Sequence, residues 1–209
     1  MEAIELQSMT DWTALIEKPS KCIISPDASD LAECLRQEGY CMVDRTMRAT
    51  IPLKKDRDFS CLCRIPLERV ERPEKRIYEI AKQAFLPDSR FFDRTNASEE
   101  EKRASISAYV DEMQSFYICR CKGEIAGFLE VLPDKDDKNQ AVIRFAAVDE
   151  AYRIAGTAMS LYAGVADKCR EQGVKRLWGR ISSRNMPVLN LYATLGAAFS
   201  MPLDVYMRR

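Results

Sequence analysis

The sequence contains no histidine among its 209 residues, and this absence removes several kinds of chemistry. Serine and cysteine nucleophiles are commonly activated by a neighbouring imidazole, and histidine is also the commonest general base near neutral pH. Neither arrangement is available to this chain. Any proton transfer must therefore involve carboxylates, tyrosine, cysteine or water.

An excess of charge of either sign is also missing, because 32 Lys and Arg residues are balanced by 32 Asp and Glu residues. Proteins that bind nucleic acid or an anionic membrane surface usually carry a strongly basic patch. The composition therefore argues against nucleic acid and membranes as partners. No apolar run reaches the roughly 20 residues of a membrane span, and the N-terminal stretch is acidic rather than signal-like. We expect a cytoplasmic protein.

Cysteine is present but not in the spacing of a metal site. The eight cysteines are scattered, and the two closest pairs, Cys61/Cys63 and Cys119/Cys121, have C-x-C spacing. Structural zinc sites usually need two to four residues between paired ligands. Cysteine in reduced cytosolic proteins often serves as a small apolar residue. We predict no metal.

Hydrophobic patterning predicts an α/β chain in two parts, and 46% apolar residues suffice for a full core. The first part is expected to form a strand, a helix and a strand, over residues 21–25, 29–38 and 40–53. A polar run at residues 54–58 follows, so we place a boundary near residue 55. The prediction is an N-terminal α/β extension over 1–55 and a main domain over 56–209.

The main domain is expected to contain a mixed, mostly antiparallel sheet flanked by helices. Ser98 and Glu101 have the spacing of a capping box, and Lys122-Gly123 suits a hairpin turn. Strands are predicted over residues 60–67, 116–121, 125–132, 141–148, 174–181 and 199–207. Helices are predicted from residue 73 to about 85, then over 98–114, 156–173 and 185–195.

The junction after strand 141–148 carries the motif Arg153-x-x-Gly156-x-Ala158. Small residues let a ligand approach the backbone closely. The first turn of a helix has unpaired N–H groups and a partial positive charge, which favour a bound diphosphate. A second motif, Ser183-Arg-Asn185 followed by Tyr192 and Gly196-Ala-x-Phe199, lies one strand further on.

The order of elements and these two motifs resemble the GNAT superfamily of N-acetyltransferases, over roughly residues 60–209. The family's acetyl-CoA signature, Gln/Arg-x-x-Gly-x-Gly/Ala, matches Arg153, Gly156 and Ala158. The resemblance implies the GNAT fold, acetyl-CoA as cosubstrate and an amine as acceptor. It also implies a separation between strands 141–148 and 174–181, often at a β-bulge, where the pantetheine arm lies.

The resemblance further implies a set of site residues. The backbone N–H of Val148 would stabilise the developing oxyanion, and Tyr192 would protonate the departing thiolate. Asn185 would contact the coenzyme or cap its helix. The predicted cofactor-binding residues are Ala146, Ala147, Val148, Arg153, Ile154, Ala155, Gly156, Thr157, Ala158 and Asn185. Three carboxylates near the strand ends leave the general base open: Glu130, Asp149 and Glu150.

Weaker similarities concern the acceptor. Leu35-x-x-x-Gly39, Ala84-Phe85 and Ser89-Arg90-Phe91 resemble segments of dTDP-fucosamine acetyltransferases. These enzymes acetylate the amino group of a dTDP-linked amino sugar. In an acceptor of this kind, Arg90 and Arg94 would bind the nucleotide diphosphate, and Phe91 would stack on the base.

Other interpretations stay open. The acceptor is alternatively another small amine, an antibiotic or a protein N-terminus, and a non-catalytic acyl-CoA-binding or regulatory module is a further alternative. The sequence also leaves a homodimer open. The N-terminal extension resembles a degenerate half of the main domain, in an alignment that places Asp27 opposite Asn185 and Cys34 opposite Tyr192.

Overall fold

The computed structural model describes residues 4–15, 18–87, 97–114, 116–153 and 156–208. They form a nine-stranded sheet with the order β1-β2-β9-β3-β8-β7-β6-β5-β4. The strands are β1 (Ile4–Leu6), β2 (Lys21–Ile24), β3 (Tyr40–Pro52), β4 (Leu67–Val70), β5 (Phe116–Cys121), β6 (Glu124–Pro133), β7 (Gln140–Val148), β8 (Arg176–Ser182) and β9 (Ala198–Arg208). The helices are α1 (Met9–Ala14), α2 (Ser29–Gln37), α3 (Lys75–Phe85), α4 (Glu99–Asp111), α5 (Thr157–Glu171) and α6 (Met186–Thr194), with short 3-10 helices η1 (Ser60–Leu62) and η3 (Glu150–Tyr152).

The predicted mixed, mostly antiparallel sheet is confirmed. The pairs β1–β2 and β7–β8 are parallel, and the other neighbouring strands are antiparallel. The capping box of α4 is present, with the Ser98 hydroxyl accepting from the Glu101 N–H and the Glu101 carboxylate accepting from the Ser98 N–H. Lys122 and Gly123 both have positive φ, as a two-residue hairpin turn between β5 and β6 requires. Among the described residues, no helix combines the length and the apolar character needed to cross a membrane.

One predicted strand is wrong. We expected the main domain to open with a strand over residues 60–67, but the pairing strand β4 begins only at Leu67. The Asp58 carboxylate accepts hydrogen bonds from the N–H and the hydroxyl of Ser60, at 2.8 and 2.9 Å, and this turns the chain into η1. Local hydrogen bonds from Ser60 to the Asp58 side chain therefore override the alternating pattern that indicated a strand.

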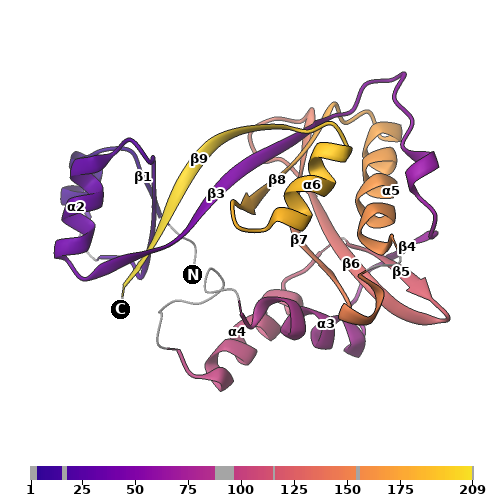
Figure 1. Ribbon diagram of the computed structural model, residues 1–209, viewed down its shortest axis with the longest axis horizontal. Coiled ribbons are helices and arrows are strands. Elements are labelled where there is room, and N and C mark those ends of the chain that lie inside the picture. The colour runs from indigo at the N-terminus through magenta and orange to yellow at the C-terminus, as the bar shows by residue number, and fades with distance from the viewer. Residues whose placement is uncertain (1–3, 16–17, 88–96, 115, 154–155, 209) are drawn as a thin grey trace.

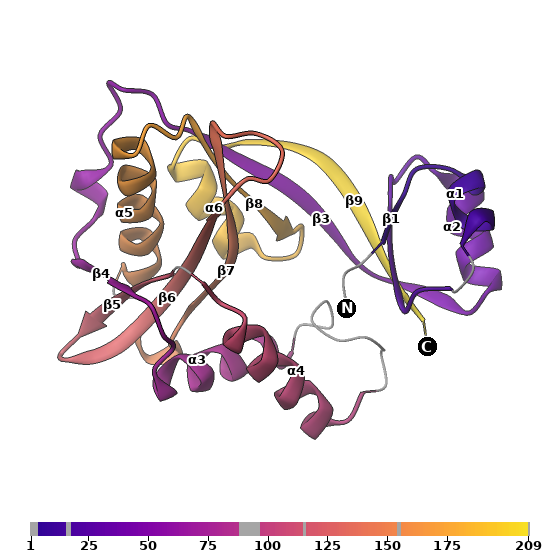
Figure 2. The same cartoon turned by 180° about the vertical axis from the view of Figure 1, so that it is seen from behind.

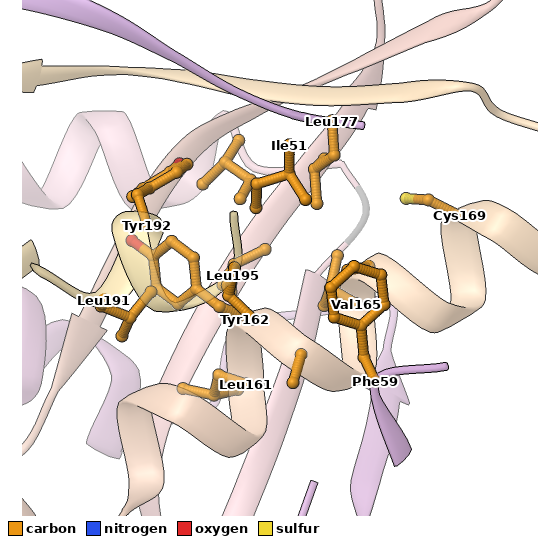
Figure 3. Packing of buried hydrophobic residues seen from close by; sticks show 14 of the residues in the cluster. Ile51, Phe59, Leu161, Tyr162, Val165, Cys169, Leu177, Leu191, Tyr192 and Leu195 are labelled. Carbon is orange, nitrogen blue, oxygen red and sulfur yellow. The ribbon is translucent and has the colours of Figure 1, made fainter. Parts of the chain in front are cut away.

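Helices cover the two faces of the sheet in pairs (Figure 1). Along β5, Tyr117 and Cys119 pack in a core with α5 and α6, whereas Phe116 and Ile118 pack in a second core with α3 and α4. Alternating residues of a strand point to opposite faces, so α5 and α6 lie on one face and α3 and α4 on the other. Figure 3 shows the first core, with two tyrosines of α5 and α6 at one end and Phe59 at the other.

The N-terminal segment has a third core and is joined to the rest by two long strands. Trp12, Leu31 and Leu35 pack there with Tyr206 of β9. Strands β3 and β9 run side by side from this N-terminal lobe (β1, α1, β2 and α2) into the main body, as both views show (Figures 1 and 2). The predicted boundary near residue 55 falls in the loop after β3, and the sheet continues across it.

Six neighbouring strands, β1-β2-β9-β3-β8-β7, read the same from either end when β1, β2 and β3 are exchanged with β7, β8 and β9. Helices α2 and α6 have nine residues each, and each is followed two residues later by a glycine with positive φ, Gly39 or Gly196. These bounds correct the predicted alignment of the two halves by one residue. Leu35, rather than Cys34, corresponds to Tyr192. That the N-terminal segment is a degenerate half stays a prediction.

Because β3 and β9 take part in both lobes, we expect the chain to unfold in one cooperative transition. The two tryptophans report separately on the lobes: Trp12 is buried in the N-terminal core, and Trp178 lies on β8. Trp12→Phe leaves Trp178 as the remaining tryptophan, and Trp178→Phe leaves Trp12. In each variant, the denaturant midpoint measured by tryptophan fluorescence should equal the midpoint measured by far-UV circular dichroism. Two separate midpoints in either variant would instead make residues 1–55 an independent unit.

Candidate active site

A β-bulge opens the sheet between β7 and β8. Val131 of β6 lies opposite Ile143, but its neighbour Glu130 lies opposite Phe145, so Arg144 is an extra residue in β7. Pairing between β7 and β8 stops at this point, with Ile143 opposite Gly179 as the last pair. A bulge bends its strand and increases the local twist. The two parallel strands therefore separate beyond residue 143.

The backbone of β7 beyond the bulge faces this opening. The Asp149 N–H donates to the Ala126 carbonyl at 2.9 Å, so this pair is a hydrogen-bonded pair of the antiparallel ladder. Such pairs alternate with non-bonded pairs, whose N–H and C=O groups point away from the partner strand. By this alternation the backbone groups of Ala146 and Val148 point away from β6, toward the open side, whereas those of Ala147 pair with β6.

Two neighbouring cavities that share lining residues lie at the opening. The wider one, of about 390 Å³, is lined by β7, α5 and α6 and includes Val148, Arg153 and Ala158. The narrower one, of about 120 Å³, lies between β7 and β8 and includes Arg144, Arg180 and Tyr192. Both cavities are lined by Phe85, Ala146, Tyr162, Asn185 and Val188. The opening thus runs from the start of α5 to the Tyr192 side chain.

The start of α5 fits a diphosphate. Gly156 is the N-cap of this 15-residue helix, with φ of 74°, and apart from its chain neighbours and the backbone of its own helix no atom of the described residues lies within 4 Å of where its Cβ would be. The Thr157 hydroxyl is fully buried and has no hydrogen-bond partner in the described part of the chain. Arg153 is exposed beside it. Ile154 and Ala155, also predicted to contact the cofactor, lie outside the described residues.

Tyr192 lies at the other end of the opening. Its ring is buried and packs edge-on against Tyr162 of α5, with ring centroids 5.3 Å apart (Figure 3). A Cβ on Gly179 would overlap the Tyr192 hydroxyl, so the glycine of β8 makes room for the phenol. Burial raises the pKa of Tyr192 well above its usual value of 10, and Tyr162 raises it further. The phenol therefore keeps its proton at every working pH.

This raised pKa changes the predicted proton balance. With an ordinary phenol, transfer to a thiolate would be nearly balanced; with the buried phenol it is less favourable. A thiolate in the same buried opening is destabilised by the same loss of water, which raises the thiol pKa as well. The two effects oppose one another, so Tyr192 stays a competent acid only toward a thiolate that is itself buried.

The three carboxylates considered as bases are all engaged elsewhere. Glu130 is fully buried and accepts two hydrogen bonds from the Arg144 guanidinium, at 2.5 and 3.1 Å. Asp149 pairs with Arg76 and caps η3, and Glu150 accepts from Gln83 at 3.0 Å. Within the described residues, no carboxylate lines either cavity.

Asn185 has one of its two predicted roles, that of capping α6, and its contact with the coenzyme stays a prediction. Its side-chain oxygen accepts from the Val188 N–H at 3.3 Å and so caps α6, while the residue also lines both cavities. The acceptor residues predicted from the sequence, Arg90, Phe91 and Arg94, lie outside the described residues. The structure adds Tyr162, Gly179 and Arg180 to the opening. A glycine inside a strand pattern is a signal of close approach, but nothing in the local sequence pointed to the other two.

The N-terminal lobe lacks the matching features. Its helix α1 has six residues, and the Asp11 carboxylate accepts from the Gln7 and Ser8 N–H groups at 2.8 and 2.9 Å. The chain's own anion therefore occupies the helix start that would otherwise receive a phosphate. Leu35 stands where α6 has Tyr192. No group of three or more Cys, Asp or Glu side chains in the described residues is placed to hold a metal ion.

Comparison with known families identifies the fold. The model of the acetyltransferase (GNAT) family matches residues 75–197, more than half of the chain. A search of curated protein sequences finds no match to this chain.

Solved structures give the same fold at low identity. A conserved protein of unknown function from Staphylococcus epidermidis is 13% identical, with a TM-score of 0.61, covering 98% of this chain and 81% of that one. A GCN5-related N-acetyltransferase from Sphaerobacter thermophilus is 14% identical, with a TM-score of 0.52, and the match covers 95% of this chain and 63% of that one. A tandem GNAT protein from the clavulanic acid biosynthesis pathway is 14% identical, with a TM-score of 0.50, and the match covers 89% of this chain and 62% of that one.

The fold and the family define an acyltransferase of the kind that uses acetyl-CoA. The chain belongs to the GNAT family of acetyltransferases, and it is an N-acetyltransferase. Members of this family transfer the acetyl group to small-molecule or protein amines. The opened strands, the unobstructed start of α5 and the orphaned Thr157 hydroxyl all fit acetyl-CoA.

Gly156→Glu should raise the dissociation constant of coenzyme A by roughly 100-fold or more, because it places a carboxylate where the diphosphate would lie. The left-handed backbone adds a strain of about 1–2 kcal/mol for any L-residue. Gly173→Glu is the matched control, since Gly173 lies beyond the other end of α5 with φ of 84° and equal space. Calorimetry should show weak binding only in Gly156→Glu; equal affinities in both variants would remove the proposed diphosphate site.

Tyr192→Phe should lower kcat by about 10- to 100-fold while leaving the coenzyme A dissociation constant unchanged, because a proton donor acts in the transition state. The loss should be the same from about pH 7 to about pH 10, since the raised pKa keeps the phenol protonated. Steady-state kinetics on Tyr162→Phe serves as the comparison. An unchanged kcat in Tyr192→Phe with a large loss in Tyr162→Phe would transfer the acid assignment to Tyr162.

Proposed function

We propose that this N-acetyltransferase acetylates the amino group of a nucleotide-linked amino sugar by direct attack of the amine on the thioester. The observation that carries the reaction type is the pair of neighbouring cavities at the opening between β7 and β8, one lined by Arg153 and the other by Tyr192. A thioester arm held from the side of α5 and α6 would meet an amine arriving from the side of α3. The two reactants need no covalent enzyme intermediate.

Holding the cofactor falls to the backbone of β7 and the start of α5. The groups of Ala146 and Val148 that point toward the opening would pair with the pantetheine amides, much as an added strand does. The diphosphate would lie against the N–H groups at Gly156–Ala158 and the Arg153 guanidinium.

Charge develops on the carbonyl oxygen during attack, and the Val148 N–H is the proposed donor. A fixed backbone donor costs no reorganisation when the charge appears, and losing one such donor typically costs about 3–4 kcal/mol. The leaving thiolate would take its proton from Tyr192.

Direct attack is further supported by the surroundings of the one serine in the narrower cavity. The Ser182 hydroxyl donates to Asp44 at 2.8 Å and accepts from the Arg184 N–H at 3.2 Å. No histidine exists in the chain to activate it. The base beside Ser182 would be the Asp44 carboxylate, which is much weaker than an imidazole, so an acyl-serine intermediate is disfavoured.

The choice of acceptor rests on how basic its amino group is. It also rests on the resemblance of the segments that begin at Leu35, Ala84 and Ser89 to those of dTDP-fucosamine acetyltransferases. Because the cavities present no carboxylate from the described residues, the amine should arrive largely neutral, with water removing the last proton. An amino group on a sugar ring is less basic than a lysine side chain, so more of it is neutral near pH 7. Arg90, Phe91 and Arg94 remain the predicted contacts to the nucleotide.

The test is acetyl-CoA turnover against a panel of dTDP- and UDP-linked amino sugars, the same free amino sugars, polyamines, aminoglycosides and peptides with free N-termini. We expect the highest kcat/KM with a nucleotide-linked amino sugar. Turnover confined to free amines or peptides would move the acceptor to those classes. Binding of coenzyme A without turnover of any member would favour a regulatory module.

A further inference from the structure

The narrower cavity contains two arginines with different surroundings. Arg144 is neutralised, because its guanidinium forms a bidentate ion pair with buried Glu130. It also lies over the ring of Tyr109, 4.7 Å from the centroid. The positive charge of Arg144 is therefore already compensated within the protein by the Glu130 carboxylate.

Arg180 of β8 is half-buried and forms no ion pair with any described carboxylate. Its guanidinium donates to two neutral acceptors, the Thr46 hydroxyl at 3.3 Å and the Met201 carbonyl at 3.1 Å. These bonds fix the side chain across β3 toward β9, and neither acceptor carries a negative charge. Glu5 acts on Arg180 through space, without an ion pair. Partial burial of a charge that has no ion-pair partner costs free energy, so such an arrangement calls for a reason.

A second arginine increases that cost. Arg48 of β3 lies directly opposite Arg180 in the β3–β8 ladder. Its guanidinium donates to Gln140 at 2.8 Å and lies over the Trp178 ring, again without an ion pair to a described carboxylate. Like charges directly opposite each other on neighbouring strands destabilise a sheet.

We propose that Arg180, with Arg48 opposite it, binds an oxyanion of the acceptor, namely a phosphate of a nucleotide-linked or otherwise phosphorylated amine. Arginine suits this task because its fork of donors matches two oxygens of a phosphate or carboxylate. The site depends on the proposed function, since it identifies what the acceptor must carry besides its amine.

The position of Arg180 agrees with this assignment. It follows Gly179, the residue that makes room for the Tyr192 hydroxyl, and neighbouring side chains of a strand point to opposite faces. Tyr192 and α6 lie on the cofactor face, so Arg180 points to the acceptor face. It nevertheless lines the same cavity as Tyr192. An anion held there would place the rest of the acceptor at the opening between β7 and β8.

The electrostatics point the same way. Burial lowers the pKa of Arg180, and Arg48 lowers it further, while Glu5 opposes the change. The protein therefore disfavours this charge when no ligand is present. Because the whole chain has no net charge, a local cation is the simplest means of attracting an anionic acceptor.

A binding test needs no turnover. With coenzyme A at saturation, so that the diphosphate site on α5 is filled, inorganic phosphate should raise the melting temperature of the wild-type protein. The rise should disappear in Arg180→Gln and persist in Arg176→Gln. Arg176 is the matched control, because it lies on the same strand and is ion-paired with Asp137. Succinate at equal ionic strength distinguishes a carboxylate site from a phosphate site.

A kinetic test uses one amine with and without its phosphate, taken from the panel. Arg180→Gln should raise KM for the phosphorylated amine at least tenfold and leave KM for the unphosphorylated one unchanged. Arg180→Lys keeps the positive charge but loses the two-pronged donor geometry of arginine. Its KM for the phosphorylated amine should lie between those of the wild type and Arg180→Gln. Arg180→Gln should not lower the melting temperature without ligand, since it relieves the repulsion from Arg48. A marked loss of stability would mean that Arg180 is structural.

The proposal fails if phosphate leaves the wild-type melting temperature unchanged, whether or not succinate raises it. It fails equally if Arg180→Gln responds to phosphate as the wild type does. If no amine is acetylated but phosphate binding depends on Arg180, the anion site stands and the proposed function falls. If coenzyme A does not bind, the phosphate titration is repeated in Gly156→Glu, where the other anion site is blocked.

Discussion

The extra residue in β7 is the constraint on which the rest of the site depends. An unbroken pairing of β7 with β8 would close the sheet and leave no passage between its faces. Inserting Arg144 ends that pairing at Ile143 and turns the backbone groups of Ala146 and Val148 toward an open edge. The cost is one unpaired stretch of strand in the middle of the sheet, where a ligand can complete the ladder.

The ion pair of Arg144 with Glu130 holds this bulge in place. Glu130 also accepts from the Gln114 N–H at 3.0 Å, just beyond the end of α4, so the bulge is tied to the helices on the acceptor face. Removing one partner of a buried ion pair typically costs about 3–5 kcal/mol. Glu130, one of the three carboxylates that the sequence offered as a general base, therefore serves to shape the opening. The proposed chemistry is left to Tyr192 and the backbone of β7.

The two lobes divide structure and chemistry between them. They share the strands β3 and β9, and their helices α2 and α6 end in the same way, yet only the C-terminal lobe has the long helix with an unobstructed start. In the N-terminal lobe, Asp11 caps the short α1 and Leu35 fills the position of the phenol. What the N-terminal lobe supplies is the far end of β3, the strand that carries Arg48 beside Arg180.

The sequence by itself determined the order of elements from β2 to β3 and from α3 to β9, the capping box of α4, the hairpin at Lys122 and the position of Gly156 at the start of α5. Each of these depends on residues close together in the chain, where backbone geometry and capping act locally. The strand predicted over residues 60–67 was wrong, because hydrogen bonding to the Asp58 side chain was enough to turn the start of this alternating stretch into a 3-10 helix.

Only the tertiary structure decided which charged groups are free. Glu130 and Asp149 lie near the strand ends in sequence, but their partners Arg144 and Arg76 come from elsewhere in the fold. Arg180 carries no local signal; it matters because strand pairing places Arg48 opposite it. The bulge belongs to the same group, since a register shift is a relation between two strands. Charge compensation and register are set by contacts between distant segments, and for that reason composition and spacing could not supply them.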